Sequence, residues 1–301
     1  MIAPSRATAV RPPAAGSTVS PATLQMFSAL LEARTGQRIA SYRSWRIDTA
    51  LKSLMRDRGL GTLDQLVALL REGRDRPLAD EVVDALLNQE TSFFRDAPIF
   101  DLVVEAVAAA ERRGHRARIW CAGCATGQEP QSLAMLFAER AEAGAPMPEI
   151  LATDVSDLAL ARARAGRYTQ FEIQRGLPIR QLMRWFDGEG GEWTIKPDLA
   201  RRVMFRQHNL VADRPPAGAF DVILCRNVLL YLSPETKQAV FRTFADALRP
   251  DGLLVLGAGE TVIGQTQLFQ PSRTLRGFYE RSAVPTSDGG IAGAAQGRGG
   301  A

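Results

Sequence analysis

Between residues 21 and 89, apolar side chains recur every three or four positions, which is the spacing of amphipathic helices. Pro21 suits the first turn of a helix, and Gly36 and Gly59 follow apolar runs at positions where helices commonly end. The pattern predicts four helices, over residues 21–36, 47–59, 62–70 and 80–87. We therefore expect a small helical domain over residues 21–89, built without internal repeats.

From residue 101 onward, helical patterns alternate with short apolar runs, which are typical of buried parallel strands. The pattern predicts helices at residues 101–113, 132–142, 156–164 and 234–248, and strands at residues 119–121, 149–154, 203–210, 220–227 and 253–257. Residues 249–252 are expected to form a turn, and Phe269 and residues 275–279 can close the sheet as an antiparallel hairpin. This order of elements predicts an α/β fold with a doubly wound, mostly parallel sheet.

Residues 166–202 interrupt the alternation. Two short strand-like runs, at residues 167–171 and 192–197, flank a polar helix at residues 179–186. We expect a small insertion with β content here. Residues 1–20 and 283–301 are small, polar and rich in Gly and Pro, so they are expected to form disordered tails.

The composition permits a folded protein of one large or two small domains. The chain has 301 residues, of which 46% are apolar and 23% charged. It contains no run of 18 apolar residues and no signal-peptide core, so we expect a cytoplasmic protein without membrane insertion. The net charge of +4 permits a nucleic-acid or an acidic protein partner but does not choose between them.

The cysteine pattern argues against metal or disulfide chemistry. Cys121, Cys124 and Cys225 cannot all pair, and all lie in strand-like or turn segments, which favours reduced thiols. The Cys121–Cys124 spacing is that of a zinc or redox motif, but no second such pair exists. His115 and His208, the only histidines, show no ligand spacing with it. We therefore expect no metal site.

The stretch from Arg118 to Pro130 is the main candidate for ligand binding. Its pattern predicts a buried strand, a turn containing Gly123 and Gly127, and the start of a helix. Glycine allows positive φ and close backbone approach, and a helix N-terminus offers free N–H groups. Nucleotides, flavins and S-adenosylmethionine all use such a turn, so the pattern alone does not identify the ligand.

Further polar residues follow the predicted strands. Asp154 ends the second strand, where a carboxylate can hold both hydroxyls of a ribose; the alternative is a helix N-cap. Asn209 and Asn227 end two later strands. Because ligands of doubly wound sheets bind at the carboxyl ends of strands, these residues and the glycine turn predict one shared site.

The predicted helix that carries Ile47 and Leu51 and stops at Gly59 has a basic outer face. Arg46, Lys52 and Arg56 lie opposite its apolar residues. One interpretation is a solvated charged face, and the other is a docking surface for an acidic partner.

Several motifs together resemble the CheR-type chemotaxis receptor methyltransferases. They are Gln89-Glu-Thr-Ser-Phe-Phe-Arg95, Cys124-Ala-Thr-Gly-Gln-Glu-Pro130, Phe220-Asp-Val-Ile-Leu-Cys-Arg-Asn-Val-Leu-Leu-Tyr231 and Leu248-Arg-Pro-Asp-Gly252. The resemblance runs in order from about residue 21 to residue 282. It implies a methyltransferase fold, with the helical domain at residues 21–89 and a cofactor-binding catalytic domain at residues 90–282.

The function implied by the resemblance is transfer of a methyl group from S-adenosylmethionine to glutamate side chains on the cytoplasmic helices of chemoreceptors. The product is a glutamate γ-methyl ester, and the protein is expected to act as a monomer. The cofactor-binding positions carried over from the family are Gln89, Thr91, Arg95, Glu129, Asp154, Asn209, Leu210, Arg226 and Asn227. Arg95 and Tyr231 are the catalytic candidates. With an acidic receptor helix as substrate, Arg46, Lys52 and Arg56 become candidates for substrate docking.

The chain departs from the family pattern at a few positions. Gln89 stands where the family usually has Asn, and Gln131 where it usually has Tyr. Residues 257–260 lack the His of the family's Gly-His-Ser-Glu pattern. Residues 171–178 resemble the insertion of members that do not need a receptor C-terminal pentapeptide.

Three other functions stay open on the sequence. One is a methyltransferase of the same fold with another substrate, because a fold does not fix its function. Another is a regulator that binds the cofactor and docks on receptors without turnover. The last is a nucleic-acid-binding module. The sequence argues against this function, because it shows no basic stripe with interleaved aromatic residues.

Overall fold

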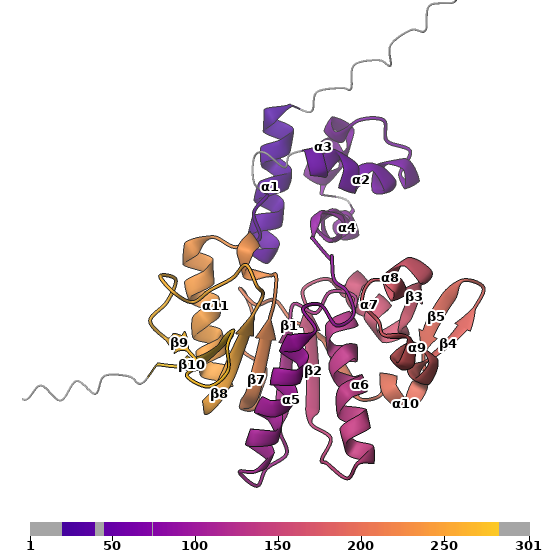
Figure 1. The fold of residues 1–301 in the computed structure, drawn as a ribbon. Helices are drawn as coiled ribbons and strands as arrows, with labels where there is room; N and C mark the ends of the chain where they lie inside the picture. The colour runs from indigo at the N-terminus through magenta and orange to yellow at the C-terminus, as the bar shows by residue number, and fades with distance from the viewer. Residues whose placement is uncertain (1–19, 40–44, 74, 283–301) are drawn as a thin grey trace, which may run out of the picture. The chain divides into compact units, whose positions relative to one another are not determined.

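The computed structural model describes residues 20–39, 45–73 and 75–282. The chain divides into two compact units, with the boundary between Asn88 and Gln89 (Figure 1). The tails expected at residues 1–19 and 283–301 lie outside the described residues. Each unit is described below by itself.

The N-terminal unit consists of helices, as predicted. Ser20 and Asp75 cap the first and last helix, and Thr62 forms a capping box with Gln65 at the third. The last helix begins at Arg76, earlier than predicted, because Asp75 caps it and a proline occupies its first turn. Buried Phe27, Leu31, Leu51, Leu66 and Val82 form the core. The four helices are α1 (Pro21–Thr35), α2 (Trp45–Asp57), α3 (Leu63–Glu72) and α4 (Arg76–Leu86).

The second unit is built on a seven-stranded sheet with the order β6-β2-β1-β7-β8-β10-β9. The neighbouring strands β6, β2, β1, β7 and β8 all pair in parallel. Strand β10 pairs antiparallel with both β8 and β9. The doubly wound, mostly parallel sheet and its terminal hairpin are therefore confirmed. The strands are β1 (Arg118–Ala122), β2 (Glu149–Asp154), β6 (Val203–Gln207), β7 (Phe220–Cys225), β8 (Leu248–Leu256), β9 (Phe269–Pro271) and β10 (Phe278–Arg281).

The two faces of this sheet carry separate apolar cores. On one face, side chains of α5, α6 and α7 pack against Ile119, Cys121 and Ile150. On the other face, α11 packs with Trp120 and Ile223. Figure 1 shows α5 and α6 in front of the strands. These helices are α5 (Pro98–Glu111), α6 (Gln128–Glu142), α7 (Asp157–Ala165) and α11 (Pro234–Ala247).

Residues 166–202 form an insertion with a small antiparallel sheet of order β3-β5-β4, which confirms the predicted β content. The prediction missed β4 because it assigned Phe186 to the preceding helix. The signal was a tight turn: Gly190 and Gly191 have φ of 60° and 86°, as a two-residue hairpin requires. The elements are β3 (Arg167–Thr169), α8 (Gln170–Gln174), α9 (Ile179–Trp185), β4 (Phe186–Glu189), β5 (Glu192–Ile195) and α10 (Pro197–Ala200).

Two strand boundaries differ from the predictions. The turn expected at residues 249–252 lies inside β8, where it forms a bulge. Phe220 pairs with Leu248 but Val222 pairs with Leu253, so residues 249–252 of β8 lie opposite the single residue Asp221 of β7. The strand expected at residues 203–210 ends at Gln207, and its last residues form a loop instead.

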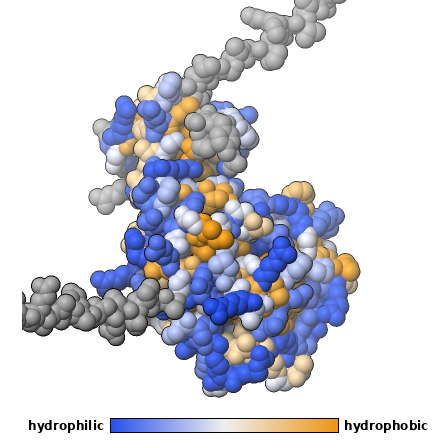
Figure 2. Space-filling model, turned by 60° about the vertical axis from the view of Figure 1, so that its left-hand side comes forward, coloured by the Kyte–Doolittle hydropathy of each residue, from blue (hydrophilic) through white to orange (hydrophobic). Residues whose placement is uncertain are grey.

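Among the described residues, no helix is both long and apolar enough to cross a membrane. On the face of the molecule drawn in Figure 2, apolar residues gather in small patches surrounded by hydrophilic ones.

Candidate active site

The predicted site residues lie at one edge of the large sheet. The glycine turn follows β1, Asp154 ends β2, Asn209 comes shortly after β6, and Asn227 shortly after β7. Because these four strands are parallel and adjacent, their carboxyl ends meet at the same edge. The prediction of a shared edge is confirmed.

The glycine turn is held close to the end of β2. The backbone N–H groups of Gly123 and Cys124 both donate to the carbonyl oxygen of Thr153, over 2.8 and 2.9 Å. Gly123 and Gly127 have φ of 80° and 91°, and a Cβ at Gly123 would lie 2.5 Å from a methyl of Val228. Any side chain at Gly123 would therefore displace the loop after β7.

Asp154 is bound into the same turn. One of its carboxylate oxygens accepts from Ala125 N at 2.8 Å, and the other accepts from Ser156 N at 3.0 Å. The N-cap of α7 is Ser156, whose hydroxyl oxygen accepts from Ala159 N, so Asp154 does not serve as the cap. Since each carboxylate oxygen accepts more than one hydrogen bond, these contacts are compatible with hydroxyl donors from a ligand.

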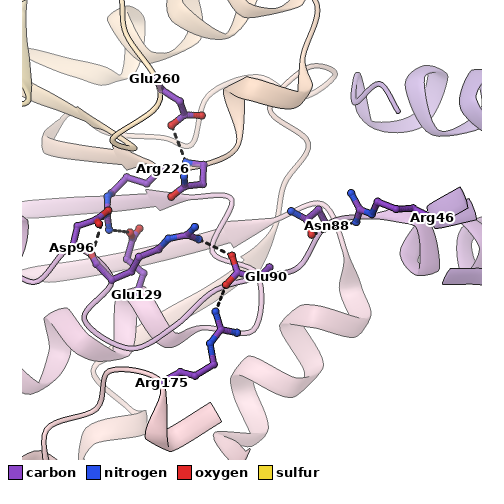
Figure 3. A network of polar contacts seen from close by, with 10 residues as sticks. Arg46, Asn88, Glu90, Asp96, Glu129, Arg175, Arg226 and Glu260 are labelled. Carbon is purple, nitrogen blue, oxygen red and sulfur yellow. Dashed lines mark hydrogen bonds and ion pairs between the residues drawn. The ribbon is translucent and has the colours of Figure 1, made fainter. Parts of the chain in front are cut away.

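A partly buried ion-pair network joins the first turn of α6 to the end of β7 (Figure 3). Arg226 donates to Glu129 at 2.8 Å, to Asp96 at 2.5 Å and to the carbonyl oxygen of Arg95 at 3.0 Å. The side chains of Arg226 and Glu129 are 2% and 15% exposed. Burial raises the pKa of the Glu129 carboxyl, and the charge of Arg226 opposes that rise.

A second ion-pair network links the segment before α5 to the insertion. Glu90 accepts from Arg95 over 2.9 Å through one oxygen and from Arg175 through the other (Figure 3). Burial alone would raise the pKa of Glu90, but these two arginines lower it below its usual value. Glu90 is therefore ionised at neutral pH and holds the Arg95 side chain in place.

Phe93 anchors this same segment in the core. Its ring is fully buried and packs edge-on against Tyr168 and Phe186 of the insertion, with centroid distances of 4.9 and 5.7 Å. The N–H of the next residue, Phe94, donates to the hydroxyl of Ser132 in α6 over 3.0 Å. The segment that carries Gln89 to Arg95 is thus fastened to both the insertion and α6.

Glu260 shapes the loop after β7. Its carboxylate accepts from the backbone N–H groups of Asn227 and Gly257, each at 2.8 Å, and of Leu230 at 3.2 Å. Asn227 has a positive φ of 60°, which this contact helps to hold. The short 3₁₀ helix Leu229–Tyr231 follows at once, so the same carboxylate sets the position of half-buried Tyr231.

The remaining cofactor candidates have structural contacts of their own. Gln89 donates to the hydroxyl of Ser156 over 3.0 Å, so the longer amide reaches the end of β2. The side-chain oxygen of Asn209 accepts from the N–H groups of Val211 and Ala212, which makes a local turn. Thr91 and Leu210 are half-buried.

The three docking candidates on α2 differ in their surroundings. Lys52 and Arg56 are exposed, whereas Arg46 is half-buried and donates to the side-chain oxygen of Asn88 over 3.3 Å. Arg58, at the end of the same basic run, is paired with Asp75 and with Glu81 within the helical unit. The exposed positive charge of α2 therefore lies mainly on Lys52 and Arg56.

The three cysteines are free and fully buried, as expected. Burial raises the pKa of each thiol well above its usual value, so none is a thiolate nucleophile at neutral pH. The described residues contain no group of three or more His, Cys, Asp or Glu side chains that could hold a metal ion.

The site fits S-adenosylmethionine better than a phosphate ligand. Glu129 can pair with a positively charged amino group, and Asp154 can accept from hydroxyls. The side-chain oxygen of Asn227 is buried and accepts no hydrogen bond from the described residues, so it can take a donor from a ligand. The glycine turn carries no lysine for a phosphate group.

Comparison with known proteins identifies the family. Residues 89–278 match the family model described as "CheR methyltransferase, SAM binding domain", which is more than half of the chain. The chain belongs to the CheR methyltransferase family. The resemblance to this family and the expected S-adenosylmethionine cofactor are thereby confirmed, since the matched domain is described as the SAM-binding domain.

Members of this CheR family with assigned names match along nearly their whole length. Chemotaxis protein methyltransferase 1 of Pseudomonas aeruginosa is 36% identical over 87% of this chain and 98% of its own. Chemotaxis protein methyltransferase of Escherichia coli is 32% identical over 86% and 90%. A solved S-adenosylmethionine-dependent methyltransferase from Mesorhizobium loti is 21% identical, covers 53% of this chain and 51% of its own, and has a TM-score of 0.30.

Sequence reasoning missed several residues that organise the site. Glu90 lies inside a quoted motif but was given no role, and Asp96 follows that motif directly. The sequence patterns assign no role to Ser132 or to Glu260. The available signal for Glu260 was a lone acid shortly after a buried strand, at the edge where the ligand residues gather.

Proposed function

We propose that this protein transfers the methyl group of S-adenosylmethionine to glutamate carboxylates on the cytoplasmic domain of a chemoreceptor. The observation that carries the proposal is the convergence of the glycine turn, Asp154 and the Glu129–Arg226 pair at one sheet edge, in a chain of the CheR family. The named relatives are chemotaxis methyltransferases, which supports a receptor as the substrate. The reaction class is protein-glutamate O-methylation.

The proposed cofactor contacts follow from the donors and acceptors at the edge. Glu129 pairs with the amino group of the cofactor, Asp154 accepts from the ribose, and Asn227 takes a further donor. Gln89, Thr91, Asn209 and Leu210 complete the cofactor contacts that the family motifs imply. When bound, S-adenosylmethionine supplies an electrophilic methyl group on a sulfonium.

The substrate needs little chemical activation. A glutamate with an ordinary pKa of about 4.3 is already an anion at neutral pH, so no general base is required. The chain has to hold a carboxylate oxygen in line with the methyl group and keep water away. In this proposal Arg95, which pairs with Glu90, orients a carboxylate, and Tyr231 borders the reacting group.

The basic surface of α2 is the proposed docking site for the acidic receptor helix. Lys52 and Arg56 provide exposed charge for electrostatic steering, and Arg46 extends the same face. A cytoplasmic location follows from a substrate on that side of the membrane.

A labelling experiment tests the proposal. The full-length protein is incubated with methyl-labelled S-adenosylmethionine and receptor cytoplasmic fragments, and alkali-labile label on glutamate is measured. Arg95→Ala and Tyr231→Phe are expected to lower turnover. Label that survives base, or wild-type turnover in both variants, would reject the assignment. Cofactor binding without any transfer would instead support a non-catalytic regulator.

A further inference from the structure

One face of the large sheet lacks a crossover helix. The parallel connections from β1 to β2, from β2 to β6 and from β7 to β8 contain α6, α7 and α11. The connection from β6 to β7, residues 208–219, is described throughout and contains no helix. Parallel sheets are normally covered on both faces by such helices. The β6–β2 end of one face is therefore open.

The open region lies on the same face of the sheet as α11, which packs over the neighbouring strands β1, β7 and β8. Trp120, Leu151 and Met204 are neighbours in register on β1, β2 and β6, and so share that face. Trp120 is buried against Phe244 of α11, but Leu151 is half-buried and Met204 is 68% exposed. Helix α11 therefore covers this face of the sheet at β1 but no longer covers it at β6.

A basic hollow of about 770 Å³ lies at this place. Its floor is apolar, with Leu151 and Met204 among the lining residues. Its charged lining consists of four arginines and one glutamate, namely Arg116, Arg118, Arg201, Arg202 and Glu149. Glu149 pairs with Arg118 at 2.9 Å and with Arg116 at 3.6 Å, and Arg201 pairs with Asp198 outside the lining. Two acids thus face four arginines, so the hollow keeps an excess of positive charge.

We propose that this hollow is a docking site for an acidic amphipathic helix of a partner protein. A helix fits because the fold leaves open the place that a crossover helix would occupy. Acidic side chains on its flanks would pair with the arginines, and its apolar stripe would cover Met204 and Leu151.

The tails of this chain do not meet these requirements. Residues 1–19 contain two arginines and no acidic residue, and residues 283–301 contain one aspartate and one arginine. Neither segment can supply a row of acids. The occupant that we consider is a separate protein.

The hollow lies at the opposite edge of the sheet from the candidate active site. Arg118 and Glu149 begin β1 and β2, whereas the glycine turn and Asp154 follow or end them. A helix bound here leaves the cofactor residues uncovered. The hollow is thus an additional interaction surface, and binding there does not depend on methyl transfer.

A designed peptide provides the probe. It is a fluorescent amphipathic helix of about 18 residues, long enough to be helical, with a leucine stripe flanked by glutamates. The matched peptide carries glutamine in place of every glutamate. Binding to the full chain is followed by fluorescence anisotropy at low and at high salt, and the bound site is located by hydrogen exchange.

The expected result is saturable binding of the acidic peptide, weakened by salt, with protection of residues 203–207 from exchange. Met204→Glu should weaken it about tenfold or more, since it replaces an apolar contact with a like charge. Met183→Glu is the matched control, because Met183 in α9 is 69% exposed and lies outside the hollow. It should bind the peptide as the wild type does.

Arg116→Glu gives a second test through an exposed side chain, in case Met204→Glu does not fold. It should also weaken binding. Absence of binding by the acidic peptide would overturn the proposal. Equal binding of the glutamine peptide, or unchanged binding by the variants in the hollow, would overturn it as well.

Discussion

Arg226, directly after β7, donates to Glu129 in the first turn of α6 over 2.8 Å, and the two side chains are only 2% and 15% exposed. Removing one member of such a pair leaves the other charge buried and unpaired. We expect Arg226→Met to lower the free energy of unfolding by about 3–5 kcal/mol, measured by urea denaturation. The double variant Arg226→Met/Glu129→Gln should be less destabilised than Arg226→Met alone. Equal or greater destabilisation of the double variant would contradict this interpretation.

The Glu129 carboxyl should make cofactor binding depend on pH. Burial raises its pKa, so it takes up a proton at a higher pH than an ordinary glutamate. We expect the affinity for S-adenosylmethionine, measured by calorimetry, to fall as the pH is lowered from about 7 toward about 5. Glu129→Gln should bind more weakly at neutral pH and show a flatter profile. A wild-type pH slope in that variant would assign the titration to another group.

The same raised pKa has a consequence for stability without cofactor. A group whose pKa is higher in the folded state contributes stability that is present below its unfolded pKa. This contribution is lost as the pH rises through the folded pKa. Glu129→Gln should therefore gain stability relative to the wild type as the pH rises through that range.

Glu90 should act as a positioning residue for Arg95. We expect Glu90→Gln to lower kcat/KM by about tenfold, because Arg95 loses the carboxylate that orients it. The free energy of unfolding should change by less than about 1 kcal/mol, since the pair is partly exposed. The control is Glu142→Gln at the end of α6, which removes a partly exposed ion pair with Arg184 of α9. Equal kinetic losses in the two variants would remove the specific role of Glu90.

Glu260 should control the loop that carries Tyr231. Glu260→Gln replaces one acceptor oxygen with a donor group that faces backbone N–H groups. We expect a loss of about 1–3 kcal/mol in unfolding free energy and a fall in kcat. Glu149→Gln, at the other edge of the sheet, is the control for kcat. Unchanged turnover in Glu260→Gln would show that the loop keeps its position without this carboxylate.

The exposed charge of α2 should make receptor methylation sensitive to salt. Lys52→Gln/Arg56→Gln should lower kcat/KM for receptor fragments at low ionic strength and flatten its salt dependence. Cofactor affinity should not change. Arg71→Gln/Arg112→Gln removes the same charge from other exposed positions and serves as the control. If both double variants behave alike, net charge and not the α2 face governs the rate.

The sheet and its ligand edge could be predicted because their signals are local. Short apolar runs, a glycine turn and acids at strand ends each appear within a few residues, and the rule for parallel sheets brings them together. The β4 strand was missed because the hydrophobic Phe186 continues the preceding helical pattern. The paired glycines that follow it were the better evidence.

The polar networks could not be predicted in the same way. Glu129 and Arg226 are far apart in the sequence, as are Glu90 and Arg175, so only the folded chain brings them together. The bulge in β8 also depends on pairing with β7, which no pattern within residues 249–252 records.

The buried contacts of Phe93 couple the insertion to the segment that precedes the active site. Tyr168 and Phe186 both pack on the Phe93 ring, so a structural change in the insertion alters the packing of the segment between Gln89 and Arg95. Linkage requires reciprocity between two coupled binding events. A protein that binds the insertion more tightly when the cofactor is present must therefore raise the affinity for the cofactor by the same factor.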